Sequence, residues 1–94
     1  MTERRFVLVD FTHMSREGYL RLYEAGRVYR LPRAVAHAAS KRGFVAVDRP
    51  PHWTAPSMFR PPEALTEAEV VEAEAELKAL QRHALELVDP KAGG

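Results

Sequence analysis

A cluster of prolines at residues 49–62 limits the fold of this chain more than any other feature, because it holds five of the seven prolines. Proline lacks an amide hydrogen, has a fixed φ and restricts the residue before it, so helices and central strands are disfavoured there. We therefore expect an extended arm over residues 49–62. It divides the chain into a small domain at residues 1–48 and a helix at residues 63–89, which a flexible tail follows at residues 90–94.

The arm also contains three large apolar side chains, those of Trp53, Met58 and Phe59. A simple spacer has no need of such side chains, and exposed apolar groups that gather in one place mark interaction sites. We expect the three to dock either on the core of the protein or on a partner, and we treat them as candidate partner-binding residues.

Residues 1–48 predict an α+β fold with a small mixed or antiparallel sheet of about four strands and one short helix. Segments rich in β-branched and aromatic residues predict the strands, at residues 5–13, 19–24, 27–31 and 44–48. An alanine-rich segment between the last two predicts the helix, which Pro32 opens and Gly43 caps. The proline-rich arm and a long acidic helix complete the expected fold.

The segment 19–24 alternates, which is typical of a half-buried strand. We expect Leu20 and Leu22 on its buried face, and a glycine turn at Ala25–Gly26 is expected to pair it with residues 27–31 in a hairpin. Its other face would present tyrosine and arginine side chains, which stack on bases and contact phosphates in nucleic-acid-binding proteins. The candidate nucleic-acid-binding residues are Tyr19, Arg21, Tyr23, Arg27 and Arg30.

The C-terminal helix has the clearest pattern. Thr66 and Glu69 form a capping box, in which the hydroxyl accepts from the amide three residues on and the glutamate reaches back. Apolar residues then follow at alternating steps of three and four, the spacing of a helix-pairing seam. The seam comprises Val70, Ala73, Leu77, Leu80, Ala84 and Leu87. It packs either on its own domain or on a neighbouring copy, and its leucines and Val70 are candidate partner-binding residues.

The net charge of +1 hides two segments of opposite sign. Residues 1–60 hold 11 basic and 5 acidic side chains, whereas residues 61–94 hold 3 basic and 8 acidic ones. Either the acidic segment folds back and neutralises the basic one, or the two form complementary surfaces that suit head-to-tail association between copies or docking on an acidic partner.

Catalytic and metal-binding patterns are missing from the sequence. There is no cysteine, the four histidines are dispersed, and no serine lies in a Gly-x-Ser-x-Gly elbow. Asp10 is the one carboxylate inside an apolar run, where a strand-end residue bonded to a loop amide is the ordinary explanation. We expect no enzyme, no cofactor and no metal site. No apolar run approaches the ~20 residues of a membrane span, so we also expect no membrane partner.

The stretch from Leu22 to Val47 resembles small tailed-bacteriophage proteins of the head and neck, in which a glycine turn precedes a strand ending in Leu-Pro, an alanine-containing helix, a glycine and a last strand. The resemblance implies a capsid-associated or connector component of the virion that is not an enzyme. It carries no site residues. The absence of asparagine and the single glutamine, Gln81, also suit a thermophilic host.

These observations predict a structural or assembly protein of a bacteriophage particle, which binds copies of itself and a larger virion protein. The alternative is a small phage regulator in the host cytoplasm, which binds a host protein or nucleic acid through its arginine- and tyrosine-rich face.

Overall fold

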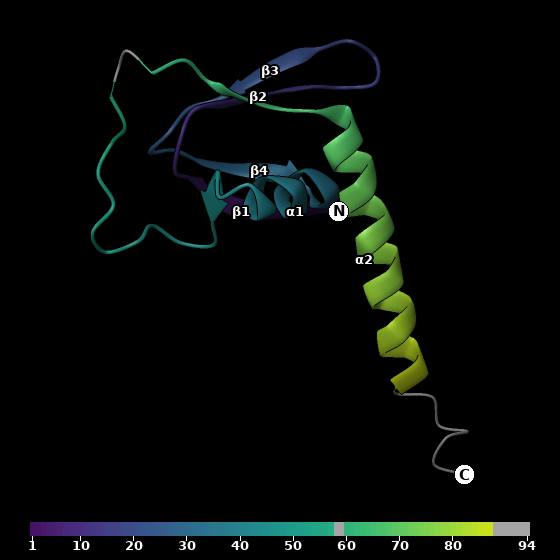
Figure 1. Ribbon diagram of the computed structural model, residues 1–94. Coiled ribbons are helices and arrows are strands. Elements are labelled where there is room, and N and C mark those ends of the chain that lie inside the picture. Colours follow the sequence, from purple (N-terminus) through teal and green to yellow (C-terminus); the bar gives the residue numbers. More distant parts are fainter. Residues whose placement is uncertain (58–59, 88–94) are drawn as a thin grey trace.

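A computed structural model describes residues 1–57 and 60–87, the last three of them through their backbone alone, and the fold class is α+β (Figure 1). The described residues form two three-stranded sheets and two helices. In chain order the elements are β1 (Thr2–Val7), β2 (Phe11–Met14), β3 (Leu20–Tyr23), β4 (Val28–Pro32), α1 (Arg33–Lys41), β5 (Val45–Ala46), β6 (Glu63–Leu65) and α2 (Glu67–Leu87). The first sheet has the order β4-β1-β5 and the second the order β3-β2-β6.

A single bent ribbon underlies both sheets. β1 pairs with β4 in a ladder that begins at Thr2 opposite Pro32. β2 pairs with β3 in a second ladder, which ends at Met14 opposite Leu20. In every pair of both ladders the two residue numbers add to 34, so the ladders are two halves of one antiparallel hairpin. The predicted single strand at residues 5–13 is therefore broken in two, and the predicted hairpin between residues 19–24 and 27–31 is wrong.

The bend between the two halves has its own hydrogen bonds. Gly26, at φ +85°, donates its amide to the carbonyl of Val7 over 2.8 Å. One carboxylate oxygen of Asp10 accepts the amide of Ala25 at 2.7 Å, which is the strand-end role that the sequence predicted for this residue. Because the bend separates the ribbon, the expected sheet of about four strands is replaced by two sheets. β5 joins the β1 half and β6 joins the β2 half.

Helix α1 forms as the sequence predicted, because both of its ends are specified locally. Pro32 precedes it, and Gly43 follows it at φ +76°. The amide of Gly43 donates to the carbonyl of Ser40 at 3.0 Å, and the amide of Phe44 donates to the carbonyl of Ala39 at 2.9 Å. These are the two hydrogen bonds of a Schellman cap. Its small apolar side chains, including Ala39, are buried.

The faces of β3 are the reverse of those expected. Tyr23 is buried, with its ring stacked on Phe11 at 4.9 Å, and Phe11 also stacks on Phe44 at 5.4 Å. Leu20 and Leu22 are exposed as a result, Leu20 by 64%. An inward Tyr23 completes a stack with Phe11 and Phe44, and aromatic pairs of this kind contribute beyond the apolar area that they bury, which favours the tyrosine face as the inner one.

Trp53 docks on the protein itself. Its ring meets Phe6 edge to face at a centroid distance of 5.0 Å, and its Nε1 donates to the carbonyl of Leu8 at 3.1 Å. The indole lies beside the bend, where a Cβ on Gly26 would come within 3.2 Å of it. The loop between β5 and β6 is thereby fastened to the ribbon where it leaves the first sheet.

Candidate interaction surfaces

The N-terminal half of α2 packs on α1 and begins with the capping box that the sequence predicted. The hydroxyl of Thr66 accepts the amide of Glu69 at 3.2 Å, and the amide of Thr66 donates to a carboxylate oxygen of Glu69 at 3.3 Å. Val70 and Ala73 are buried in the same core cluster as the residues of α1. This part of the seam is therefore filled within the chain.

Ion pairs surround this contact. In each of them a glutamate of α2 meets a cation or histidine of the first 42 residues. The pairs are Arg16–Glu67 at 2.8 Å, Arg16–Glu74 at 3.1 Å, His13–Glu67 at 3.2 Å, Arg42–Glu69 at 2.7 Å, Lys41–Glu76 at 2.6 Å and His37–Glu76 at 2.9 Å. They agree with the interpretation that the acidic segment folds back onto the basic one.

Three of these glutamates are held in their charged form by a hydrogen bond from the facing cation. Arg16 lowers the pKa of Glu67, Arg42 lowers that of Glu69, and the ammonium of Lys41 lowers that of Glu76. The carboxylates are largely solvated, so each pair contributes modestly and the set serves mainly to orient α2.

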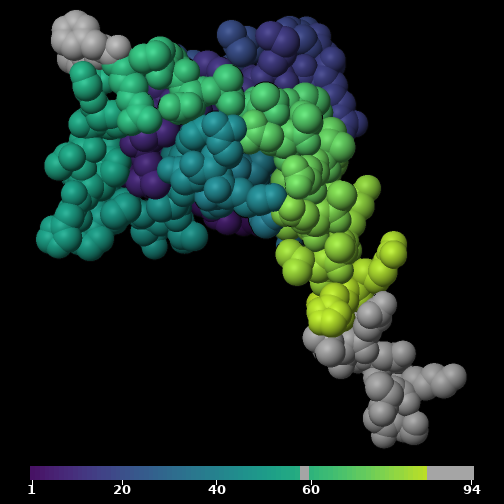
Figure 2. All heavy atoms as spheres, viewed as in Figure 1, coloured from purple at the N-terminus to yellow at the C-terminus, as the bar shows by residue number. Residues whose placement is uncertain are grey.

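The C-terminal half of α2 extends past the rest of the molecule (Figures 1 and 2). At 1.5 Å per residue, the 9 residues of α1 span about 14 Å and the 21 residues of α2 about 32 Å. Leu77 is half-buried at the limit of the contact, and Leu80 is 58% exposed beyond it. We call Leu77–Leu87 the free seam; the side chain of Leu87 lies outside the described part of the structure.

Of the other predicted partner-binding residues, those that the structure describes lie outside the free seam. Trp53 is half-buried on its own domain, and Met58 and Phe59 lie outside the described residues. The loop that carries them and α2 lie on opposite sides of the two sheets (Figure 1). Val70 belongs to the core, so Leu77 and Leu80 are the predicted anchors that the described chain leaves accessible.

The predicted nucleic-acid-binding residues are distributed over both sheets. Tyr19 is exposed in the ribbon loop, Arg21 lies over the ring of Tyr23 at 5.0 Å, and Tyr23 is buried. Arg27 pairs with Glu24 at 2.9 Å, and Arg30 lies on β4 in the first sheet. These five side chains therefore do not form the single face that the alternation of residues 19–24 suggested.

The outer face of the ribbon end is an exposed apolar surface that was not expected from the sequence. Met14 and Leu20 are opposite each other in the ladder, Leu22 follows on the same face, and all three are exposed. The alternation correctly grouped Leu20 with Leu22. What it lacked was the ring stack that draws Tyr23 inward, and this contact depends on Phe11 and Phe44, which lie far from Tyr23 in the sequence.

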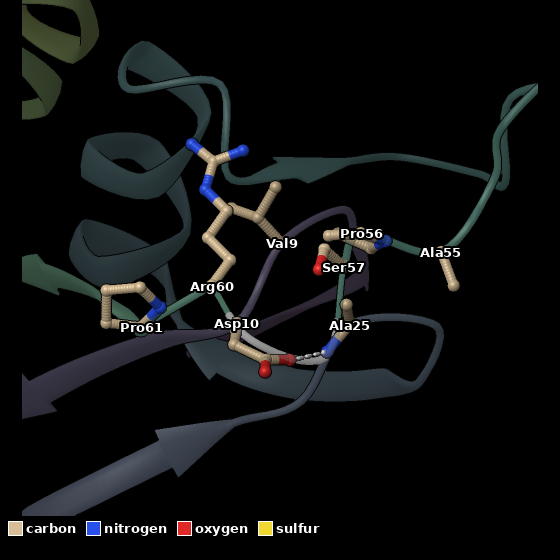
Figure 3. A pocket seen from close by; sticks show the side chains of 8 residues that line it. All are labelled: Val9, Asp10, Ala25, Ala55, Pro56, Ser57, Arg60 and Pro61. Atoms are coloured by element: carbon tan, nitrogen blue, oxygen red, sulfur yellow. Dashed lines mark hydrogen bonds between the residues drawn. The ribbon is translucent and has the colours of Figure 1, made fainter.

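A cavity of about 150 Å³ lies beside the bend, at the start and end of the loop between β5 and β6 (Figure 3). Its lining includes Asp10, Ser57 and Arg60. The carboxylate of Asp10 points to the amide of Ala25, and the side chain of Arg60 extends away from that carboxylate and pairs with Glu63 at 3.2 Å. The charged groups of this cavity are thus directed to Ala25 and Glu63, and they do not converge as an acid and base pair would.

Within residues 1–57 and 60–87, no three histidine or acidic side chains gather as metal ligands would. None of the helices in that part of the chain has the length and apolar character needed to cross a membrane. Comparison with protein families, curated proteins and solved structures finds no match to this chain. Its function is therefore argued from its surfaces.

Proposed function

We propose that this chain is a non-enzymatic assembly protein, which pairs with a second copy of itself through the free seam of α2. The observation that carries the proposal is the exposed Leu80, on a helix whose pairing pattern continues beyond the part that packs on α1. An isolated helix of this length gains little from propensity alone, and an apolar stripe that continues into solvent is a cost unless it is covered.

A second copy suits the charges of α2. The N-terminal half of the helix is rich in glutamate, and the C-terminal half carries Lys78 and Arg82. An antiparallel pair centred near Arg82 sets Lys78 of each copy level with Glu86 of the other. Charges beside an apolar seam select partner and orientation in this way, and the small side chain of Ala84 permits close approach of the helices.

The setting that we propose is a bacteriophage particle, in which the dimer also binds a larger virion protein. The resemblance of residues 22–47 to small head and neck proteins supports this setting. The exposed outer face of the ribbon end, with Met14, Leu20 and Leu22, is a separate surface on which such a partner could be accommodated.

The test is the solution mass of the protein by light scattering over a range of concentrations, for the wild type and two variants. Leu80→Glu places a charge in the free seam, whereas Ala79→Glu places the same charge on an exposed neighbour about 100° round the helix, outside the seam. We expect concentration-dependent dimers for the wild type and Ala79→Glu and a monomer for Leu80→Glu. A wild-type monomer at all concentrations, or equal masses for the two variants, would contradict the proposal.

A further inference from the structure

Helix α1 covers one face of the first sheet, and on the other face Trp53 covers Phe6 and leaves the remainder exposed. Val7, Leu31 and Val45 are buried on the side that α1 covers, and α2 packs in turn on α1. Successive residues of a strand alternate between faces, so Arg4 on β1 and Arg30 on β4 belong to the opposite side. Both are exposed.

These two arginines face each other directly across the ladder, since Arg4 pairs with Arg30 in the register of β1 and β4. Like charges in this position destabilise a sheet unless something compensates them. Among the described residues, Arg4 and Arg30 have no acidic partner within 4.0 Å. The same holds for Arg49, whose guanidinium lies 5.5 Å from the centre of the Trp53 ring. By contrast, Arg16, Arg27, Arg42 and Arg60 each have a carboxylate oxygen within 3.2 Å.

Two shallow hollows connect these arginines. One, of about 370 Å³, is lined by Arg4, Val28, Tyr29 and Arg30. The other, of about 290 Å³, shares Arg4 and Val28 and extends past Phe6, Val47 and Asp48 to Arg49. Asp48 is the acidic side chain in this lining, and Val28 and Val47 are 47% and 67% exposed. We call Arg4, Val28, Arg30, Val47 and Arg49 the arginine face.

We propose that the arginine face binds the sugar-phosphate backbone of a nucleic acid. A guanidinium presents a planar fork of donors that matches two phosphate oxygens, and exposed valines between such groups offer an apolar surface to the sugars that separate successive phosphates. An acidic helix would be expected to repel the same ligand. Here α2 lies beyond α1 on the covered side of the sheet, so its glutamates do not border the arginine face.

The proposal does not depend on the free seam, because the arginine face is complete within one copy of the chain. The contacts that we propose are to phosphates and sugars alone, so binding is expected to be independent of sequence and strongly dependent on salt. Three cationic contacts set an upper limit of about three released counterions, hence a slope of log affinity against log salt no steeper than about −3.

The experiment measures fluorescence anisotropy of a labelled DNA of arbitrary sequence, as duplex and as single strand. The test variant is Arg4→Ala with Arg30→Ala, and the control is Arg33→Ala with Arg60→Ala, which changes the net charge equally but removes arginines that face Glu3 and Glu63. We expect the test variant to lose roughly tenfold in affinity per arginine near 0.1 M salt and about two units of salt slope. The control should keep most of the affinity.

Far-UV circular dichroism establishes that the variants fold, and Arg4→Lys with Arg30→Lys should retain most binding because it keeps both charges. Absence of wild-type binding, or equal losses in the test and control variants, would overturn the proposal. So would displacement of DNA by poly-glutamate at equal charge concentration, because that result would assign the arginine face to an acidic polypeptide.

Discussion

Replacing Trp53 by alanine separates two roles for this residue, because the structure makes it an internal anchor and the sequence suggested a partner-binding one. The indole donates a hydrogen bond to Leu8 and meets Phe6 edge to face. Such a bond contributes about 1 kcal/mol and such a ring pair about 0.5–1.5 kcal/mol. With the apolar area of a half-buried ring, we expect Trp53→Ala to lower the free energy of unfolding by about 3 kcal/mol.

Trp53→Phe is a milder substitution for comparison, because it keeps an aromatic ring against Phe6 and loses the N–H donor. It should cost about 1–2 kcal/mol, and His52→Ala, an exposed neighbour, less than about 0.5 kcal/mol. Urea unfolding followed by circular dichroism measures all three. Trp53 is the only tryptophan, so its fluorescence in the wild type reports directly on its docking. In a domain of this size, a loss of 3 kcal/mol lowers the melting temperature by roughly 12–24 °C.

The reasoning would be refuted if Trp53→Ala unfolded within about 1 kcal/mol of the wild type. If that variant also weakened association with a partner protein, the sequence-based role would be the correct one. Loss of stability together with an unchanged solution mass at temperatures where the variant is folded would establish the internal role.

Two further predictions concern the bend and the docking of α2. Gly26→Ala should destabilise the fold by about 2 kcal/mol, because φ is +85° there and the new Cβ would lie 3.2 Å from Trp53. Gly18→Ala is the control, since Gly18 has φ +90° with open space around it and should show only the cost of the positive φ. Urea unfolding of both variants measures the difference in their free energies of unfolding. The pKa of Glu69 is lowered from its usual 4.5 by Arg42, so this pair stabilises the fold above about pH 4.5 and its contribution declines as the pH falls further. The melting temperature of Glu69→Gln should therefore lie below that of the wild type at pH 7 and approach it at pH 3; a constant difference would count against the pair.

Local signals in the sequence predicted those parts of the fold that depend on neighbouring residues. Helix α1 is bounded by Pro32 and by the cap at Gly43, and α2 begins at a capping box whose partners are three residues apart. Both helices begin where these local signals predict, because each end satisfies its own backbone groups. The expected helix at residues 63–89 was wrong at its start, since Glu63–Leu65 pair with β2 as strand β6.

The bend of the ribbon and the faces of β3 depend on contacts distant in sequence, and these were mispredicted. Residues 6–11 are apolar apart from Asp10 and contain no glycine or proline, so the sequence did not indicate a bend where Asp10 bonds to Ala25. The burial of Tyr23 likewise depends on Phe11 and Phe44. The free seam was partly predictable: the spacing identified its residues, but its exposure follows from the short length of α1.

The shared register of the ribbon has a consequence for the order of folding. In residues 2–32, pairing can begin next to the turn at residues 15–19, where the partners are close in sequence, and then extend outward along the ribbon. Hairpins of this kind form in about 1–10 μs. β6 must close a loop of about 50 residues before it reaches β2, which places it among the late contacts. During synthesis, the first third of the chain can thus present both halves of a central strand, each with one edge open, before the residues that complete either sheet have emerged from the ribosome.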